Sequence, residues 1–220
     1  MGLSPAEGLT RAEQTYSAGE SRSLRAGNLH AENDYGERNL PGGEVYTAPV
    51  IDAVDGEVLF DGPTFYQGQE FRNVQVTLED DEVVDHEAEA GAELPGEMFE
   101  NDPGFQRLGG LGFGMDRQID HPAKNVLLDE KTGATVHMAL DKAIPWNGGE
   151  NREASESDYH VDLIVDMSED AFIEVDGERI YEDGWYVFEE GGRWRVIRFS
   201  VTVYRCVGRP GRRCAGNDLQ

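Results

Sequence analysis

The sequence predicts an α+β fold dominated by an antiparallel β-sheet, and three observations carry this prediction. Between residues 39 and 205, most segments either alternate apolar and polar residues or concentrate β-branched residues, as strands do. Turn-forming residues separate these segments. Only residues 93–102 favour a helix. We therefore expect one β-rich α+β unit with an antiparallel sheet.

The expected strands follow one another along this body. In chain order they cover residues 57–62, 73–88, 126–140, 160–167, 171–189 and 194–205. Within residues 171–189, Asp176-Gly177 is a two-residue hairpin signal, because a tight type I′ turn needs a positive φ at both central positions. The sequence shows no repeat of fixed period, so a repeat array is not expected.

The two ends of the chain differ from its middle. Residues 1–38 are rich in Gly, Ser, Ala and Arg with little periodicity, and we expect them to be poorly ordered or weakly helical. Residues 39–205 then form a single domain, which a chain of 220 residues allows. After Glu190 the charge changes from acidic to basic. Residues 206–220 are therefore expected to form a basic irregular tail, either an interaction segment or an end altered by a frame change or truncation.

The chain is strongly acidic, with 44 Asp and Glu against 19 Lys and Arg and a net charge of -25. Lysine is rare, and the lysines are Lys124, Lys131 and Lys142. Acidic, lysine-poor surfaces are typical of halophilic proteins, because at about 1 M salt the screening length falls to ~3 Å and self-repulsion weakens. Such a surface repels nucleic acid, so we expect no nucleic-acid partner.

Targeting and redox signals are sparse. The apolar runs fall short of the ~20 residues that a membrane-spanning helix needs. The first residues, 1-MGLSPAEGLTRAEQ-14, lack the apolar core of a secretory signal. Cys206 and Cys214 form no CxxC pair. We therefore expect a soluble cytoplasmic protein without a membrane partner.

Two histidines and a carboxylate lie on expected strands with a face free for chemistry. His160 and Asp162 are two residues apart, so in a strand they point to one side while Val161 and Leu163 point to the other. His137 lies on the opposite face of its strand from the apolar residues beside it. Each of these alone is more typical of a hydrogen-bonded bystander or surface pair than of a metal ligand.

Glu44 is the fourth candidate. It follows 41-PGG-43, where glycines permit a tight turn before a strand, and alone it is also typical of a solvated turn. Two histidines, an aspartate and a glutamate together suit a divalent ion with nitrogen and oxygen ligands. Their spacing forms no recognised motif, so the residues by themselves predict only an oxygen-rich metal site on a β scaffold.

Longer strings of sequence narrow this prediction. They are 39-NLPGGEVYTAP-49, 61-DGPTFYQGQ-69, 108-LGGLGFGMD-116, 129-DEKTGATVHMAL-140, 148-GGEN-151, 160-HVD-162 and 171-AFIEVDGE-178. In this order they resemble the aminopeptidase T and aminopeptidase S family of metallopeptidases, up to about residue 190. The resemblance implies a metal-dependent aminopeptidase that removes N-terminal residues from short peptides. It also implies two divalent ions (Zn, Co, Mn or Mg) and a homodimer.

The resemblance also assigns site residues. It places Glu44, His137, His160 and Asp162 among the metal ligands. A further glutamate of the family falls at Gly110, which leaves the catalytic residue unassigned and leaves two alternatives open, two bound ions as in the family or a single ion.

Two further departures concern a tyrosine and the chain's N-terminal part. A tyrosine of the family falls at Ile144. The family carries a large N-terminal domain before this point, whereas 43 residues precede Glu44 here, so that domain is expected to be largely absent.

These departures leave several hypotheses open. The chain is a working aminopeptidase, or it is a truncated or degenerate relative that keeps partial metal binding and little turnover. An acidic domain with a purely structural role is the third hypothesis, and it predicts no tightly bound metal. A nearby carboxylate could replace the lost glutamate, and the candidates are Glu97, Glu100, Asp102, Asp116 and Asp120.

Overall fold

The computed structural model describes residues 21–36, 39–66, 68–90, 93–140, 160–189 and 200–206. Its strands are β1 (Ser21–Asp34), β2 (Glu44–Phe60), β3 (Thr64–Tyr66), β4 (Gln69–Glu79), β5 (Glu82–Ala90), β6 (Leu108–Gly114), β7 (Thr135–Leu140), β8 (Val161–Asp166), β9 (Ala171–Val175), β10 (Glu178–Glu182), β11 (Trp185–Tyr186) and β12 (Ser200–Cys206). The helices are α1 (Glu93–Asn101), the 3₁₀ turn η1 (Pro103–Gln106) and α2 (Val126–Asp129). Among the described residues, neither α1 nor any other helix has the length and apolar character to cross a membrane.

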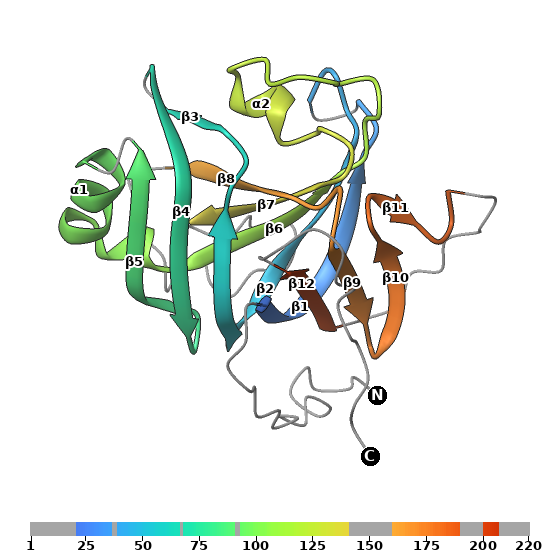
Figure 1. Cartoon of the computed structure of the whole chain (residues 1–220). Helices are drawn as coiled ribbons and strands as arrows, with labels where there is room; N and C mark the ends of the chain where they lie inside the picture. The colour runs from blue at the N-terminus through green and yellow to red at the C-terminus, as the bar shows by residue number, and fades with distance from the viewer. Residues whose placement is uncertain are drawn as a thin grey trace, which may run out of the picture.

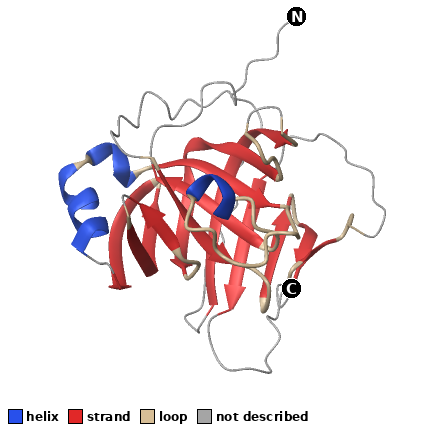
Figure 2. Ribbon diagram, turned by 90° about the horizontal axis from the view of Figure 1, so that it is seen from above, coloured by secondary structure: helices blue, strands red, loops and turns tan. Residues whose placement is uncertain are grey.

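The strands form one antiparallel sheet of 12 strands. Its main order is β11-β10-β9-β12-β1-β2-β6-β7-β8, and β4 branches from β2 with β3 and β5 beside it. Figure 1 shows β5 and α1 at one side, β9 to β11 at the other, and β6 to β8 between them. Figure 2 shows that strands make up the body of the molecule, with most of the helical turns gathered at one edge. The strand-rich α+β prediction is confirmed.

The long strand β2 connects the two parts of the sheet. Its first residues, Glu44–Thr47, pair with β6, and its last residues, Gly56–Phe60, pair with β4. One strand thus brings its N-terminal end beside β6 and β7, where the candidate site lies.

The core lies against one face of β7 and β8. Val136, Met138 and Leu140 of β7 are buried together with alternate residues of β8. These are the apolar faces that alternation predicts, since side chains two apart share a face. The opposite faces of the same strands therefore carry the polar candidates.

Two local predictions are confirmed. The helix expected at residues 93–102 is α1, which ends at Asn101. The hairpin expected at Asp176-Gly177 joins β9 to β10, and these residues have φ values of 52° and 79°, the left-handed region that the turn needs.

Two other expectations were wrong. Residues 126–140 are not one strand, because Val126–Asp129 forms α2 and only Thr135–Leu140 is β7. The Asn125 side chain accepts a hydrogen bond from Leu127 N at 3.1 Å and caps this turn, a local bond that competes with strand pairing. Residues 21–34, expected to lack a strand, form β1, because pairing with β2 and β12 supplies the partners. The predictions for residues 1–20 and 207–220 lie outside the described residues.

Arg117 joins the segment after β6 to the β10–β11 hairpin. Its Nε and Nη2 donate to the two carboxylate oxygens of Glu189 at 3.0 and 2.7 Å, and its guanidinium lies 4.5 Å from the Trp185 ring centroid. It also donates to the Gly184 carbonyl. The hairpin is therefore tied to the loop by one side chain.

We expect Arg117→Ala to lower the free energy of unfolding by about 1–2 kcal/mol, because a bidentate ion pair and a cation–π contact are lost together. Thermal unfolding should show this as a fall of roughly 2–6 °C in Tm. Arg72→Ala, at a more exposed Arg72–Glu70 pair, is the control and should change Tm by less than about 2 °C. Equal shifts for the two variants would contradict the assignment.

Candidate metal centre

Four neighbouring strands present their polar face to the candidate centre. Gly112 of β6 pairs with Tyr46 of β2 and with His137 of β7, and His137 pairs with Ile164 of β8. Because alternate residues share a face, Glu44, His137 and Asp162 project from the same side of the sheet. The candidates from distant parts of the sequence are thus brought together by strand register.

Glu44 begins β2 directly after Gly43. Gly43 has a φ of 123°, its N–H donates to the Asp34 carbonyl at 2.7 Å, and its carbonyl accepts from Met115 N at 2.9 Å. An L side chain rarely adopts this backbone, so the turn that aims Glu44 requires glycine.

Glycines on β6 make room for the His137 imidazole. A Cβ added at Gly112 would lie 2.0 Å from His137 Nε2, so the ring lies over the backbone of β6 at this position. At Gly110 an added Cβ would meet only the Cβ of Ala139, at 3.4 Å. Gly112 is therefore needed for the position of the ring, whereas Gly110 leaves open space.

Three buried side chains form the centre. Ligand atoms of Glu44, Glu130 and His137 all lie within 4.8 Å of one another. His137 Nε2 is 3.2 Å from Glu44 Oε2. Glu130 comes from the turn after α2, and this carboxylate was not among the ligands predicted from the sequence. Two carboxylates and an imidazole are a donor set that suits a divalent ion.

The remaining predicted ligands lie at the edge of this group. His160 Nε2 is 3.3 Å from Asp162 Oδ2, so the pair shares a face as alternation predicts. The Asp162 side chain is 6% exposed, whereas that of His160 is 57% exposed. Asp162 interacts with Glu130 as well, which connects it to the centre. The structure thus brings Glu44, His137 and Asp162 together and leaves His160 at the rim.

Lys131 lies inside the centre. Its side chain is fully buried, and its ammonium donates to Glu44 Oε1 at 3.1 Å and to Glu130 Oε1. Burial would lower the pKa of Lys131, but the two carboxylates raise it above its usual value. The ammonium is therefore held in its charged form between them.

Burial and neighbouring charges also shift the pKa values of the other ionisable groups at the centre. Burial and the charge of Asp162 raise the pKa of Glu130 to about 7. Burial would also raise the pKa of Glu44, but His137 and Lys131 hold it below its usual value. For His137, burial would lower the pKa, but the hydrogen bond to Glu44 and the charge of Asp162 raise it. The buried carboxylates of this centre are thus stabilised in their charged form by nearby cations.

The fit of a metal ion is supported by an orphaned atom as well as by the donor set. His137 Nδ1 is buried, and it has no hydrogen-bond partner among the described residues. Such an atom is rare unless a ligand, water or ion completes the site. The residues present therefore fit a divalent ion.

The other carboxylates considered as replacements are not part of this group. Glu97 and Glu100 are exposed on α1. Asp102 caps η1 by accepting from Gly104 N at 2.8 Å, and Asp116 accepts from Gln118 N at 2.8 Å. Asp120 pairs with His121. Glu130 is the carboxylate found at the centre instead, while Ile144 and residues 148–151 lie outside the described residues.

Glu130 belongs to the quoted string 129-DEKTGATVHMAL-140, seven residues before His137. Assigning residues 126–140 to one strand hid it, because in a strand residues seven apart lie on opposite faces. The polar run Asp129-Glu130-Lys131 beside an asparagine cap was the available signal for a turn here.

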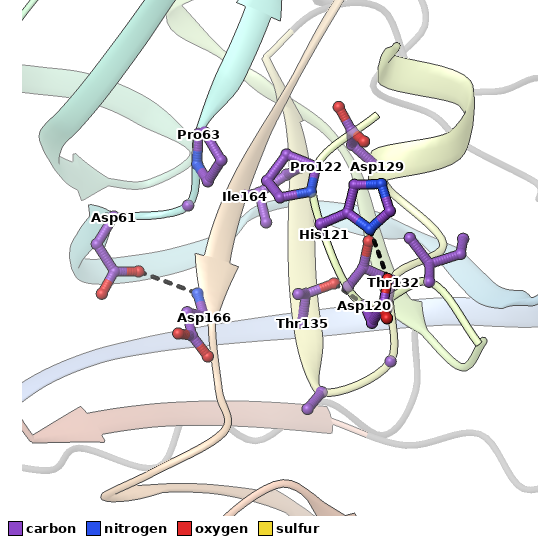
Figure 3. Close-up of a pocket in the computed structure, with 14 residues that line it drawn as sticks. Asp61, Pro63, Asp120, His121, Pro122, Asp129, Thr132, Thr135, Ile164 and Asp166 are labelled. Carbon is purple, nitrogen blue, oxygen red and sulfur yellow. Dashed lines mark hydrogen bonds and ion pairs between the residues drawn. The ribbon is translucent and has the colours of Figure 1, made fainter. Parts of the chain in front are cut away.

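A pocket of about 320 Å³ adjoins the centre on the same side of the sheet. Thr135 and Ile164, which line it, share the strand faces of His137 and Asp162, and in the view of Figure 3 they lie between Asp61 on one side and His121 and Asp129 on the other. Backbone N–H groups bind several of the carboxylates that line the pocket. Asp61 accepts from Asp166 N at 2.9 Å, and Asp129 accepts from Ala123 N and Asn125 N at 2.6 and 3.0 Å. These carboxylates shape the loop around the pocket.

The fold and the centre define a β-sheet protein with a buried group of two glutamates and a histidine, a donor set that suits a divalent ion. The chain matches the thermophilic metalloprotease (M29) family over residues 15–194, so it belongs to this family. The resemblance found in the sequence motifs is thereby confirmed.

Similarity to individual proteins supports the same family assignment. The chain is 32% identical over 185 residues to Aminopeptidase AmpS of Bacillus subtilis (strain 168), which covers 74% of this chain and 44% of the relative. It is 33% identical over 174 residues to Aminopeptidase T of Thermus aquaticus, covering 72% of this chain and 40% of the relative. The chain thus spans less than half the length of these relatives.

Solved structures share the fold. Wild-type AmpT from Thermus thermophilus matches with a TM-score of 0.59 and 25% identity, over 76% of this chain and 50% of that one. The 2,5-dihydroxypyridine dioxygenase from Pseudomonas putida KT2440 matches with a TM-score of 0.54 and 15% identity, over 76% and 55%. The latter likeness concerns the fold alone.

Proposed function

We propose that this chain carries the metal-binding part of an aminopeptidase that removes N-terminal residues from short peptides. The observation that carries the proposal is the buried group of Glu44, Glu130 and His137 in a chain of this family. A divalent ion held there would act as a Lewis acid on the carbonyl of the scissile bond. The relatives named as aminopeptidases support the substrate class.

The chain's own residues have separable tasks in this proposal. Glu44, Glu130 and His137 supply the ligand atoms, and Asp162 lies beside them. His160 lies at the exposed rim, where it orients Asp162.

The direct test combines metal content with peptidase activity. The full chain is purified gently in high salt, its ions are counted by elemental analysis, and release of leucine from a chromogenic leucine derivative is followed with added Co²⁺ or Zn²⁺. We expect at least one divalent ion per chain and release that stops on chelation. Absence of any bound ion would overturn the metal centre, and bound ion without release would overturn the peptidase activity.

A second hypothesis, a degenerate relative that binds metal with little turnover, is favoured by Gly110. This residue pairs with Ala139, which pairs with Asp162, so its position faces the centre but contributes no carboxylate. The open space at Gly110 would admit a side chain. Under this hypothesis the sheet that carries the site is intact, and only the carboxylate expected at position 110 is missing.

We expect Gly110→Glu to raise the rate of leucine release by about tenfold or more, because a positioned acid or base contributes about 10²–10⁴-fold when its placement is ideal. Gly110→Ala is the matched control, since it fills the same space without a carboxylate. A silent wild type with an active Gly110→Glu variant would establish the degenerate relative. Equal rates in all three proteins would show that the missing carboxylate at Gly110 does not limit leucine release.

The remaining expectations accompany this proposal. We propose a homodimer in the cytoplasm, and a working range at high salt because the net charge is -25. Sedimentation at several salt concentrations tests the association, and thermal unfolding over the same series tests the salt requirement.

A further inference from the structure

Lys131 is the least expected residue of the centre. Its side chain is fully buried, whereas Lys124, the other lysine in the described part of the chain, is exposed. Lysine is almost never buried unless it is paired, because removing an ammonium from water costs several kcal/mol before its partners compensate. The role of the Lys131 charge can therefore be inferred from the residues that contact the ammonium.

The ammonium of Lys131 bridges two carboxylates that belong to the metal-binding group. It lies 3.1 Å from Glu44 Oε1, from a strand 87 residues away, and it also bonds to Glu130 Oε1. Lys131 thus contacts two of the three candidate ligands, and it bonds Glu44 through Oε1 while Glu44 Oε2 faces His137.

The backbone fixes this placement. Lys131 N donates to the Leu128 carbonyl at 3.1 Å, and its own carbonyl accepts from Asp116 N at 2.8 Å. The turn after α2 is therefore anchored on both sides of Lys131, and the ammonium does not depend on a free loop for its position.

We propose that Lys131 is an internal cation of this centre, a positioning residue that holds Glu44 and Glu130 together in the metal-free protein and limits the centre to one divalent ion. This inference rests on the metal centre proposed above. Charge supports it, because the centre has three carboxylates, Glu44, Glu130 and Asp162. One ammonium and one divalent ion neutralise these three charges, and a second divalent ion would have to displace the ammonium from the oxygens it occupies.

The test compares the wild type with Lys131→Met, which keeps an unbranched chain without charge. Lys124→Met is the matched control, since it removes an exposed lysine from the same chain. Each protein is stripped of metal and melted, and then titrated with Co²⁺ while visible absorbance and elemental analysis report affinity and stoichiometry.

We expect the metal-free Tm of Lys131→Met to fall by about 10 °C, because the two carboxylates lose their shared partner. With Co²⁺ we expect Lys131→Met to bind two ions per chain, or one ion at least tenfold more tightly, while the wild type and Lys124→Met bind one. If Lys131→Met unfolds without metal, Lys131→Gln, which keeps a hydrogen-bond donor, is measured in its place. Unfolding that Co²⁺ reverses supports the inference.

Two results would overturn it and are distinguishable. If wild type and Lys131→Met bind Co²⁺ with the same affinity and stoichiometry, or melt at the same metal-free Tm, Lys131 is not the internal cation proposed, although the metal centre stands. If neither protein binds any Co²⁺, the metal centre itself fails, and the inference fails with it.

Discussion

Gly112→Ala is expected to abolish tight divalent-ion binding although it adds a single methyl group. The new Cβ would lie 2.0 Å from His137 Nε2 and 2.2 Å from its Cε1, distances that no packed structure tolerates. β6 is paired with β2 and β7 on its two sides and has little room to shift. The imidazole must therefore turn away, and its 3.2 Å contact with Glu44 is lost.

The measurement is the Kd for Co²⁺ or Zn²⁺, which should rise by about 100-fold or more, with a loss of about 1–3 kcal/mol in stability from overpacking. Gly110→Ala is the control on the same strand and the same face, because its Cβ meets only Ala139 Cβ at 3.4 Å. It should bind ions as the wild type does. Unchanged affinity in Gly112→Ala would mean that His137 is not a ligand in the position found here.

Glu44→Gln is expected to have the second large effect, on both metal affinity and stability. The Glu44 carboxylate accepts from Lys131 and faces His137 Nε2, so it is the charge shared by both buried cations. Glutamine keeps the shape but removes the charge. Breaking a buried ion pair by removing one partner costs about 3–5 kcal/mol, because the remaining charge is left uncompensated.

We expect the Kd for Co²⁺ to rise by about 100-fold or more and the metal-free Tm to fall by roughly 6–15 °C. Glu57→Gln provides the control on the same strand, where the Glu57 carboxylate accepts from Gln75 at 2.6 Å away from the centre. Urea unfolding and ion titration of both variants give the comparison. A stable Glu44→Gln variant with full affinity would show that the centre does not depend on this carboxylate.

From the sequence, His137 and His160 were both predicted to be metal ligands. The sequence pattern placed each on a strand face opposite the core, so alternation could not separate them. Tertiary structure separates them because β7 lies between two other strands, whereas His160 precedes the first residue of β8. Burial of His137 and exposure of His160 follow from these positions.

By itself, the sequence determined the local features of this protein. Alternation identified the core faces of β7 and β8, Asp176-Gly177 identified a hairpin, and the ordered motifs identified the family. These depend on neighbours within a few residues or on short strings, so a linear pattern is sufficient.

Only the tertiary structure decided what surrounds Glu44. Lys131 lies 87 residues away in the chain, and its contact with Glu44 depends on the path from β2 through β6 to the turn after α2. Sequence periodicity cannot predict such a contact. The hydrogen-bond register between distant strands, and the space that Gly112 leaves for the imidazole, exist only once the sheet is assembled. The physical reason is that a buried charge is positioned by its partners, and those partners meet only in the folded chain.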